Sequence, residues 1–274
     1  MADVYVNNWS EFVSAVAVSG DTVYLPENSE WDMEEILPWG TQSAITMACT
    51  EINGRGTTIK NLHLNQAIIY TKNSLRIRNL IMKDWLCEGN DGSEESKAVF
   101  GCTSNYRIYF YSCAFSGILS SEKKHFVYGF PYNNNCSFNI EASGSWFEFS
   151  RVSGSVNRYC RIEMHLPNNT GVGLFGLDCE FCELIAYSPN ATGMFYSSYH
   201  KGCTFRGNLQ GITQDRASST WDGFVSVYLD GTFGEGFSAK AKNGFVKCTE
   251  AQMKDPEYLR DKGFPIVVIE DGDT

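Results

Sequence analysis

Three glutamates and one histidine have the types and spacing that acid–base chemistry would need. Glu141, Glu163 and Glu183 recur at intervals of 22 and 20 residues, and His165 follows Glu163 by two. Glycoside hydrolases use two carboxylates about 5 to 10 Å apart, and a glutamate beside a histidine can serve as acid and base. The purely structural alternative is a row of surface ion pairs, because Arg161 would lie opposite Glu183 if these segments were aligned strands. Either reading needs a fold that aligns these segments.

Other patterns that carry chemistry are weak or missing. Cys179 and Cys182 form a CxxC pair, and no second CxxC or CxxH exists to complete four zinc ligands. Phosphate loops, nucleotide fingerprints, nucleophile elbows and His-x-x-x-His patterns are absent. Asp178 and Glu180 lie near an expected turn and add little. We therefore expect no metal and no cofactor, and a protein without enzymatic activity is favoured over an enzyme.

A repeat provides the alignment that the glutamates require. Five segments begin with cysteine and place an apolar residue two positions on, with mostly polar residues between, which is the period of a strand with one buried face. Their cysteines recur every 21 to 24 residues. The segments begin at Cys113, Cys136, Cys160, Cys182 and Cys203, and the apolar residues are Phe115, Phe138, Ile162, Leu184 and Phe205.

A second set of apolar segments lies between the cysteine strands, so each period contains at least two strands and their turns. The segments are residues 98–101, 126–129, 146–149, 172–175 and 194–196. A period of this length is too short for a strand and a returning helix, and it suits one rung of a coil whose equivalent strands pair in parallel. The sequence therefore predicts an all-β fold, a single right-handed parallel β-helix, over residues 21–214. The cysteines would form an inward column of small buried side chains.

Both ends of the coil carry helix signals. Trp9, Phe12, Val13 and Val16 form one apolar helix stripe, with Asn8 as N-cap. This segment, residues 1–20, is expected to cap the first rung. Residues 215–274 are expected to be an irregular end cap or docking segment, with loose strands over 221–237, short helices starting after Thr249 and Asp255, and a strand-like tail at 266–269.

The opening of the chain resembles that of pectate-lyase-like β-helix proteins: a capping helix, a Gly-Asp-Thr-Val strand at residues 20–23 and a turn bearing Trp31. The resemblance covers the architecture from about Trp9 to Gly211. The resemblance implies the fold alone and carries no enzyme motif. The Asn-x-Asp, Asp-Asp and Gly-His-Gly motifs of the β-helical polygalacturonases are missing.

The net charge, hydropathy and cysteine content limit the classes of binding partner and the cellular location that we expect. The net charge of −10 disfavours nucleic acids and anionic membranes, which would be repelled at long range. No apolar run is long enough to span a bilayer, and residues 1–4 have neither the charge nor the hydropathy of a secretion signal. Ten cysteines without a leader predict reduced thiols in a protein made in the cytosol.

These features together favour a structural protein of a phage or prophage virion, because such proteins fold in the host cytoplasm and leave by lysis. The chain resembles small β-helical virion components such as capsid-decoration, head-fibre or tail proteins. That resemblance implies a mechanical or adhesive role, a homo-oligomer with a trimer favoured, contact with other virion proteins, and location in the virion. A host cell-surface glycan is a further possible partner. The alternatives are a polysaccharide lyase or glycoside hydrolase using Glu141, Glu163, His165 and Glu183, and a carbohydrate-binding module that uses exposed tyrosines at positions 106, 109, 111, 132, 187 and 199.

Overall fold

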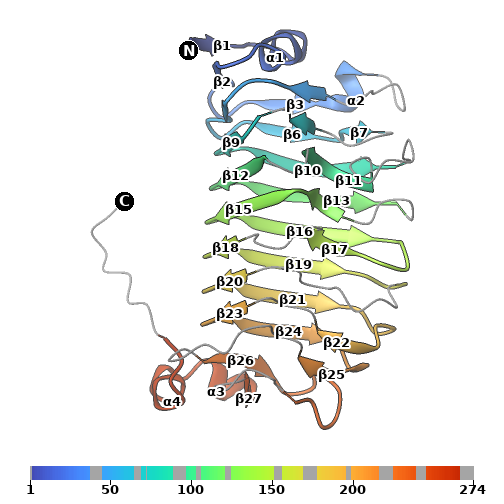
Figure 1. The fold of residues 1–274 in the computed structure, drawn as a ribbon, viewed down its shortest axis with the longest axis vertical. Helices are drawn as coiled ribbons and strands as arrows, with labels where there is room; N and C mark the ends of the chain where they lie inside the picture. Colours follow the sequence, from blue (N-terminus) through green and yellow to red (C-terminus); the bar gives the residue numbers. More distant parts are fainter. Residues whose placement is uncertain are drawn as a thin grey trace.

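Parallel strand pairing runs through the described part of the chain between residues 3 and 248 (Figure 1). The computed structural model describes residues 2–37, 45–64, 69–71, 73–88, 97–102, 106–120, 125–150, 156–168, 178–195, 199–215, 225–238 and 245–265. Within these ranges, each strand pairs with its equivalent one rung away, as β12 and β15 do for Arg107–Tyr111 and Phe130–Asn134. The predicted all-β, single parallel coil is therefore confirmed.

Three long sheets form the sides of the coil. The first, called sheet A here, has nine strands: β1 (Asp3–Tyr5), β2 (Thr22–Tyr24), β5 (Glu51–Asn53), β9 (Leu75–Arg78), β12 (Arg107–Tyr111), β15 (Phe130–Asn134), β18 (Val156–Arg158), β20 (Asp178–Glu180) and β23 (Tyr199–Lys201). Sheet B has eleven: β3 (Glu30–Asp32), β6 (Thr58–Lys60), β10 (Ile81–Cys87), β13 (Ala114–Leu119), β16 (Ser137–Ala142), β19 (Arg161–His165), β21 (Glu183–Tyr187), β24 (Thr204–Asn208), β26 (Ser226–Leu229), β27 (Phe245–Cys248), and β7 (His63–Leu64) beside β10.

Sheet C has five strands: β4 (Ile45–Met47), β8 (Ile69–Thr71), β11 (Ala98–Cys102), β14 (His125–Tyr128) and β17 (Glu148–Ser150). A two-stranded sheet joins β22 (Gly193–Phe195) and β25 (Ile212–Asp215). The predicted second set of segments thus corresponds to β11, β14, β17 and β22, while residues 172–175 lie outside the described residues. The sequence did not separate the strands of sheet A, which make a third side of each rung.

The cysteine column forms the corner between sheets A and B. All five repeat cysteines are buried, as predicted, although each lies one residue before its sheet B strand. The apolar positions two residues on also stack in register, from Phe115 to Phe138 to Ile162 and on to Leu184 and Phe205. The rings of Phe115 and Phe138 lie parallel, with centroids 5.5 Å apart.

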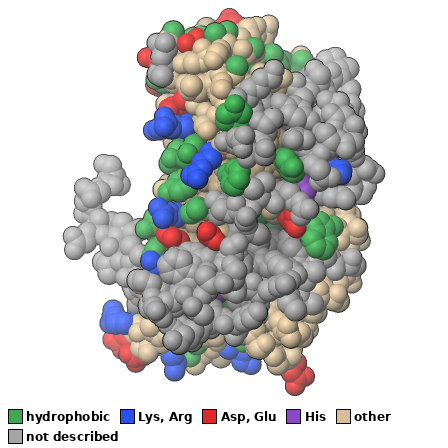
Figure 2. Space-filling view, in the orientation of Figure 1, with side chains coloured by type: hydrophobic (Ala, Val, Ile, Leu, Met, Phe, Trp, Pro, Cys, Tyr) green, Lys and Arg blue, Asp and Glu red, His purple; other side chains and the backbone are tan. Residues whose placement is uncertain are grey.

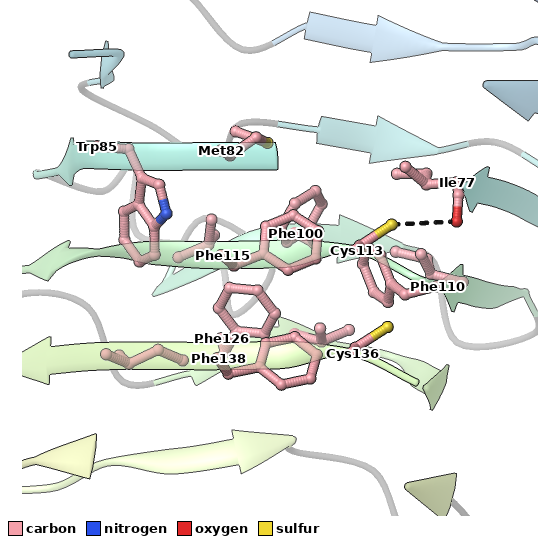
Figure 3. Packing of buried hydrophobic residues seen from close by; sticks show 14 of the residues in the cluster. Ile77, Met82, Trp85, Phe100, Phe110, Cys113, Phe115, Phe126, Cys136 and Phe138 are labelled. Carbon is pink, nitrogen blue, oxygen red and sulfur yellow. Dashed lines mark hydrogen bonds between the residues drawn. The ribbon is translucent and has the colours of Figure 1, made fainter. Parts of the chain in front are cut away.

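Aromatic side chains fill the middle of the coil. Phe126 is fully buried, and its ring lies 5.3 Å from Phe100, 5.5 Å from Phe115 and 5.3 Å from Phe138, as measured between centroids. Figure 3 shows these rings reaching the interior from different sides of the coil. The core therefore depends on contacts between sheets as well as on stacking along each sheet.

The first rung is covered as the sequence predicts. Helix α1 (Trp9–Val16) begins at Asn8, whose side chain accepts a hydrogen bond from the Glu11 amide at 3.0 Å. Trp9 and Phe12 pack against Trp31 in the rung below, with centroids 6.2 and 5.9 Å away. Strand β1, which was not predicted, adds an outer strand to β2. A short helix, α2 (Met33–Ile36), follows β3.

The other end carries two short helices at the signals that predicted them. Helix α3 (Glu250–Met253) has a capping box between Thr249 and Gln252, and α4 (Pro256–Asp261) is capped by Asp255. Within the predicted C-terminal segment, β26 and β27 continue sheet B beyond β24 before the helices begin. Figure 1 shows α3 and α4 at the opposite end from α1. The predicted tail at 266–269 and the start of the 221–237 stretch lie outside the described residues.

Candidate functional site

The four predicted site residues lie on the outward face of sheet B, on the adjacent strands β16, β19 and β21. Glu141 is opposite His165 in the register of β16 and β19, and Arg161 is opposite Glu183 in the register of β19 and β21. Glu163 lies between Arg161 and His165 on β19. The projection from the repeat therefore placed these side chains correctly on one surface.

Strict alternation explains why they point outward. Along β16, residues 137–142 alternate between exposed and buried, and β19 keeps the same alternation with Ile162 and Met164 inside. Side chains at every second position share a face of a strand. On β21 the outward position between Glu183 and Tyr187 is Ile185, which is buried. An apolar residue therefore interrupts the polar row.

Arg161 binds two of the three glutamates. Its guanidinium contacts the carboxylate of Glu183, and its Nη2 lies 3.1 Å from Oε2 of Glu163. Partial desolvation opposes the charge of Arg161, but attraction to Glu183 and hydrogen bonds to both carboxylates outweigh it, so the pKa of Arg161 is raised. Arg161 therefore stays a cation at any pH the protein meets and holds both carboxylates in one ion-pair row.

His165 is held from two sides. Its Nε2 lies 3.0 Å from Oε1 of Glu163, and its ring stacks on Tyr187 with centroids 4.8 Å apart and planes 19° apart. The side chain of His165 is 43% exposed, so one part of the ring still meets solvent. Glu141 is exposed, and the structure shows no ion pair for it among the described residues.

The geometry of this cluster is that of a satisfied surface network. Hydrolysis of a glycosidic bond needs one carboxyl group to give a proton and the other to attack or activate water. Here Glu163 and Glu183 share one guanidinium, and Glu163 also contacts His165. The Glu163–His165 pair is the part that could transfer a proton to a bound substrate. The sequence predicted the pair of Arg161 with Glu183, but it did not predict that Arg161 also contacts Glu163.

The remaining predicted groups do not join this cluster. Asp178 and Glu180 lie on β20 in sheet A, on a different side of the coil, and Glu180 pairs with Arg158 at 2.9 Å. Cys179 and Cys182 are both buried, and the Asn157 amide lies 3.6 Å from the sulfur of Cys179. Among the residues that the structure describes, no three His, Cys, Asp or Glu side chains are arranged to hold a metal ion.

Three other histidines are buried and serve packing. His63 contacts Glu88 at 2.9 Å, His125 lies 3.6 Å from Glu148, and His200 lies 3.3 Å from the hydroxyl of Ser226. His200 also packs on Phe245, with ring centroids 4.2 Å apart. Each histidine therefore joins neighbouring segments of the interior, and none faces the cluster on sheet B.

Comparison with known proteins adds no function to this geometry. No family model matches the chain, and no curated protein matches it. In the part of the chain that the structure describes, none of the helices has the length and apolar character to cross a bilayer.

Proposed function

We propose that this protein is a non-catalytic structural component of a phage or prophage virion, such as a capsid-decoration, head-fibre or tail protein, with a mechanical or adhesive role. The observation that carries the proposal is the continuous path of sheet B from β3 to β27, with helices at both ends. Hydrogen bonds between parallel strands run along the coil axis, so the molecule has the construction of a stiff rod.

The surface cluster on sheet B fits this role. An ion-pair row between Glu183, Arg161 and Glu163 joins neighbouring rungs at the surface. Exposed pairs of this kind contribute about 0.2–1 kcal/mol each. They keep this face of sheet B polar, which limits hydrophobic association between molecules.

Assembly tests the proposal directly. We expect a homotrimer, so light scattering after size-exclusion chromatography should give three times the 30.7 kDa of one chain. In the producing phage or prophage, the protein should co-purify with particles through a density gradient, and its gene should lie beside capsid, portal or tail genes. A monodisperse monomer at high concentration that is absent from particles would overturn the proposal.

A second candidate function is a polysaccharide lyase or glycoside hydrolase, because Glu163 and His165 are 3.0 Å apart on an accessible face. Acidic and neutral polysaccharides should be screened for new reducing ends or unsaturated products. Activity that is lost in Glu163→Gln, while the matched variant Glu257→Gln on the exposed surface of α4 stays active, would place catalysis at this cluster and reverse the order of the two proposals. We expect no turnover in any of the three proteins.

A further inference from the structure

A second surface, on sheet A, gathers aromatic and cationic side chains. We call it the tyrosine–arginine face, and it consists of Arg76, Arg78, Arg107, Tyr109, Tyr111, Tyr132 and Arg158. These residues occupy the outward positions of four consecutive strands, β9, β12, β15 and β18. Figure 2 shows basic and hydrophobic side chains alternating down the edge of the molecule where these strands lie in Figure 1.

The tyrosine rings make a continuous aromatic surface. Tyr109 and Tyr111 are two residues apart on β12, and their rings lie parallel with centroids 6.4 Å apart. Tyr132, on the next strand, lies 5.9 Å from Tyr109 and 6.1 Å from Tyr111, with its plane tilted by 46° to each. All three side chains are half-buried, so their positions are fixed while part of each ring stays accessible.

Two arginines fix the ring positions. The guanidinium of Arg78 lies 5.3 Å from the centre of the Tyr111 ring, and that of Arg158 lies 5.8 Å from the Tyr132 ring. Arg158 also donates a hydrogen bond to the Tyr132 hydroxyl at 3.1 Å. Both arginines are paired with acids: Arg78 with Glu51 at 3.2 Å and Arg158 with Glu180 at 2.9 Å. The charges of Arg78 and Arg158 are therefore largely neutralised by these two glutamates.

The other two arginines of this face, Arg76 and Arg107, are available to a ligand. Arg76 is next to Tyr109 in the register of β9 and β12, and Arg107 starts β12 two residues before Tyr109. Both are exposed, and neither forms an ion pair among the described residues. Arg76 adjoins Tyr109 on the neighbouring strand and Arg107 adjoins it along β12, so a ligand stacked on Tyr109 would lie near two guanidinium groups.

An acidic polysaccharide matches this combination better than other polymers. The apolar face of a sugar ring stacks on tyrosine, whose hydroxyl can bond to the sugar, and a carboxylate pairs with an arginine guanidinium in a bidentate manner. A nucleic acid also has stacking groups, but its closely spaced phosphates would be repelled by the net charge of −10 and by Glu51 and Glu180 at the margins of the face. A glycan that carries one carboxylate per disaccharide has more widely spaced charges and is repelled less.

We propose that the tyrosine–arginine face is a binding site for an acidic, carboxylate-bearing polysaccharide, held by stacking on Tyr109 and Tyr132 and by ion pairs with Arg76 and Arg107. Strands β9 to β18 span three strand spacings, about 14 Å, so the face accommodates a short stretch of an extended chain. The inference rests on the adhesive part of the proposed function and names the ligand class that this part would use.

Binding should be measured by microscale thermophoresis with colominic acid, hyaluronan and alginate as acidic probes, and with dextran as a neutral probe. We expect hyaluronan, which carries one carboxylate per disaccharide, to bind more tightly than colominic acid and alginate, which carry one on every sugar, and we expect dextran not to bind. The double variant Arg76→Gln/Arg107→Gln should weaken binding at least about tenfold. The matched control Lys254→Gln/Arg260→Gln removes the same charge from exposed positions on the C-terminal helices, and it should bind like the wild type.

A second pair of variants separates stacking from charge. Tyr109→Ala and Tyr132→Ala should each weaken binding by several-fold, whereas Tyr187→Ala, on sheet B, should not. Thermal melting of each variant shows whether the fold is kept, and binding is compared only at temperatures where all variants are folded.

Several results would overturn the inference. These are no binding of any acidic probe, equal loss in the control variant, unchanged binding in the tyrosine variants, and binding of oligothymidine as tight as that of the glycans. A loss of self-association in Arg76→Gln/Arg107→Gln without glycan binding by the wild type would reassign the face to contacts between copies. The trimer and particle tests above do not use these variants, so the failure of one proposal is distinguishable from that of the other.

Discussion

The repeat cysteines occupy a corner that few side chains could fill. Each follows a residue with positive φ, for example Ser112 at 51° before Cys113 and Tyr159 at 54° before Cys160. The thiol then lies close to the carbonyl of the residue two positions earlier, at 3.3 Å in Cys113 and 3.2 Å in Cys160. Cysteine is small and apolar, and its weak S–H donor can satisfy that carbonyl. The column is therefore explained by packing.

Burial also suppresses the chemistry of the thiols. It raises the pKa of Cys49 to about 12 and holds the pKa of Cys113 well above its usual value, whereas hydrogen bonds from Cys113 and Cys160 lower the pKa of Cys136 to about 4. All ten cysteines are free and buried. Because a reagent must reach a thiol before it can react with it, we expect negligible reaction of the native protein with Ellman's reagent near neutral pH, and reaction of all ten thiols in concentrated guanidinium chloride. Rapid labelling of the native protein would show that the corner opens in solution.

Asp178 offers a residue-scale test of electrostatics. Burial, and then the nearby charge of Glu180, raise its pKa above the ordinary value of 3.8. Between the pKa of Asp178 in the unfolded chain and its higher pKa in the folded chain, the unfolded chain has already released the proton. The wild type therefore loses stability as pH rises through that interval. Asp178→Asn should therefore increase the free energy of unfolding at neutral pH, and the gain should vanish below about pH 3.8.

Urea denaturation at a series of pH values would measure this effect. The control is Glu180→Gln, which removes the same charge two residues away but also breaks the contact with Arg158. We expect no gain in stability from the control. An Asp178→Asn variant that is less stable than the wild type at neutral pH would contradict the assignment.

At the scale of elements, the fold depends on a sharp turn between sheets A and B in successive rungs. The turn residues Asn79, Ser112, Asn135, Tyr159 and Phe181 all have φ between 51° and 58°. This left-handed conformation costs most residues roughly 1–2 kcal/mol, and asparagine tolerates it better than others. Where the residue is bulky, stacking compensates: the rings of Tyr159 and Phe181 lie parallel with centroids 5.4 Å apart.

Asn135→Val tests the turn. A β-branched side chain at this φ is strained, so we expect the free energy of unfolding to fall by about 1–2 kcal/mol. The same substitution at Asn139, an exposed position of β16, should be neutral or slightly stabilising because valine favours strands. Chemical denaturation of both variants measures the difference. Equal stability of the two would show that the turn is not a constraint.

At the scale of the whole molecule, stability and solubility depend on the ends of the coil. A stack of parallel strands leaves an unpaired edge at each end, and such edges promote association. At the first rung, β1 covers the edge of β2, and α1 covers Trp31. Repeat proteins need end caps of this kind.

Deleting residues 1–20 should therefore convert a defined oligomer into polydisperse assemblies, because β2 and Trp31 become exposed together. Light scattering after size-exclusion chromatography would detect the change. Asn8→Ala is the control: it removes only the N-cap of α1, costs about 1 kcal/mol and should leave the oligomer defined. A truncated protein with the same mass distribution as the wild type would show that the cap has no protective role.

The amino-acid sequence by itself determined the coil, its inward column and the starts of its terminal helices. Alternation along residues 137–142 and the spacing of the cysteines are local signals that repeat, and a capping side chain such as Asn8 or Thr249 acts on its own next turn. The surface cluster of Glu141, Glu163, His165 and Glu183 could be projected for the same reason, because register carries a side chain from one rung to the next.

Only the tertiary structure decided the rest. The strands of sheet A are three to five residues long, and no single residue type marks the equivalent position of every rung, so β1 and the third side of each rung have no local signature. The contact of one arginine with both Glu163 and Glu183 depends on how a long side chain lies across two strands. The tyrosine–arginine face, likewise, exists because strands from residues 75 to 158 stack in register. Such contacts arise between segments far apart in the chain. Their geometry is fixed by packing between rungs, and local sequence patterns do not predict that packing.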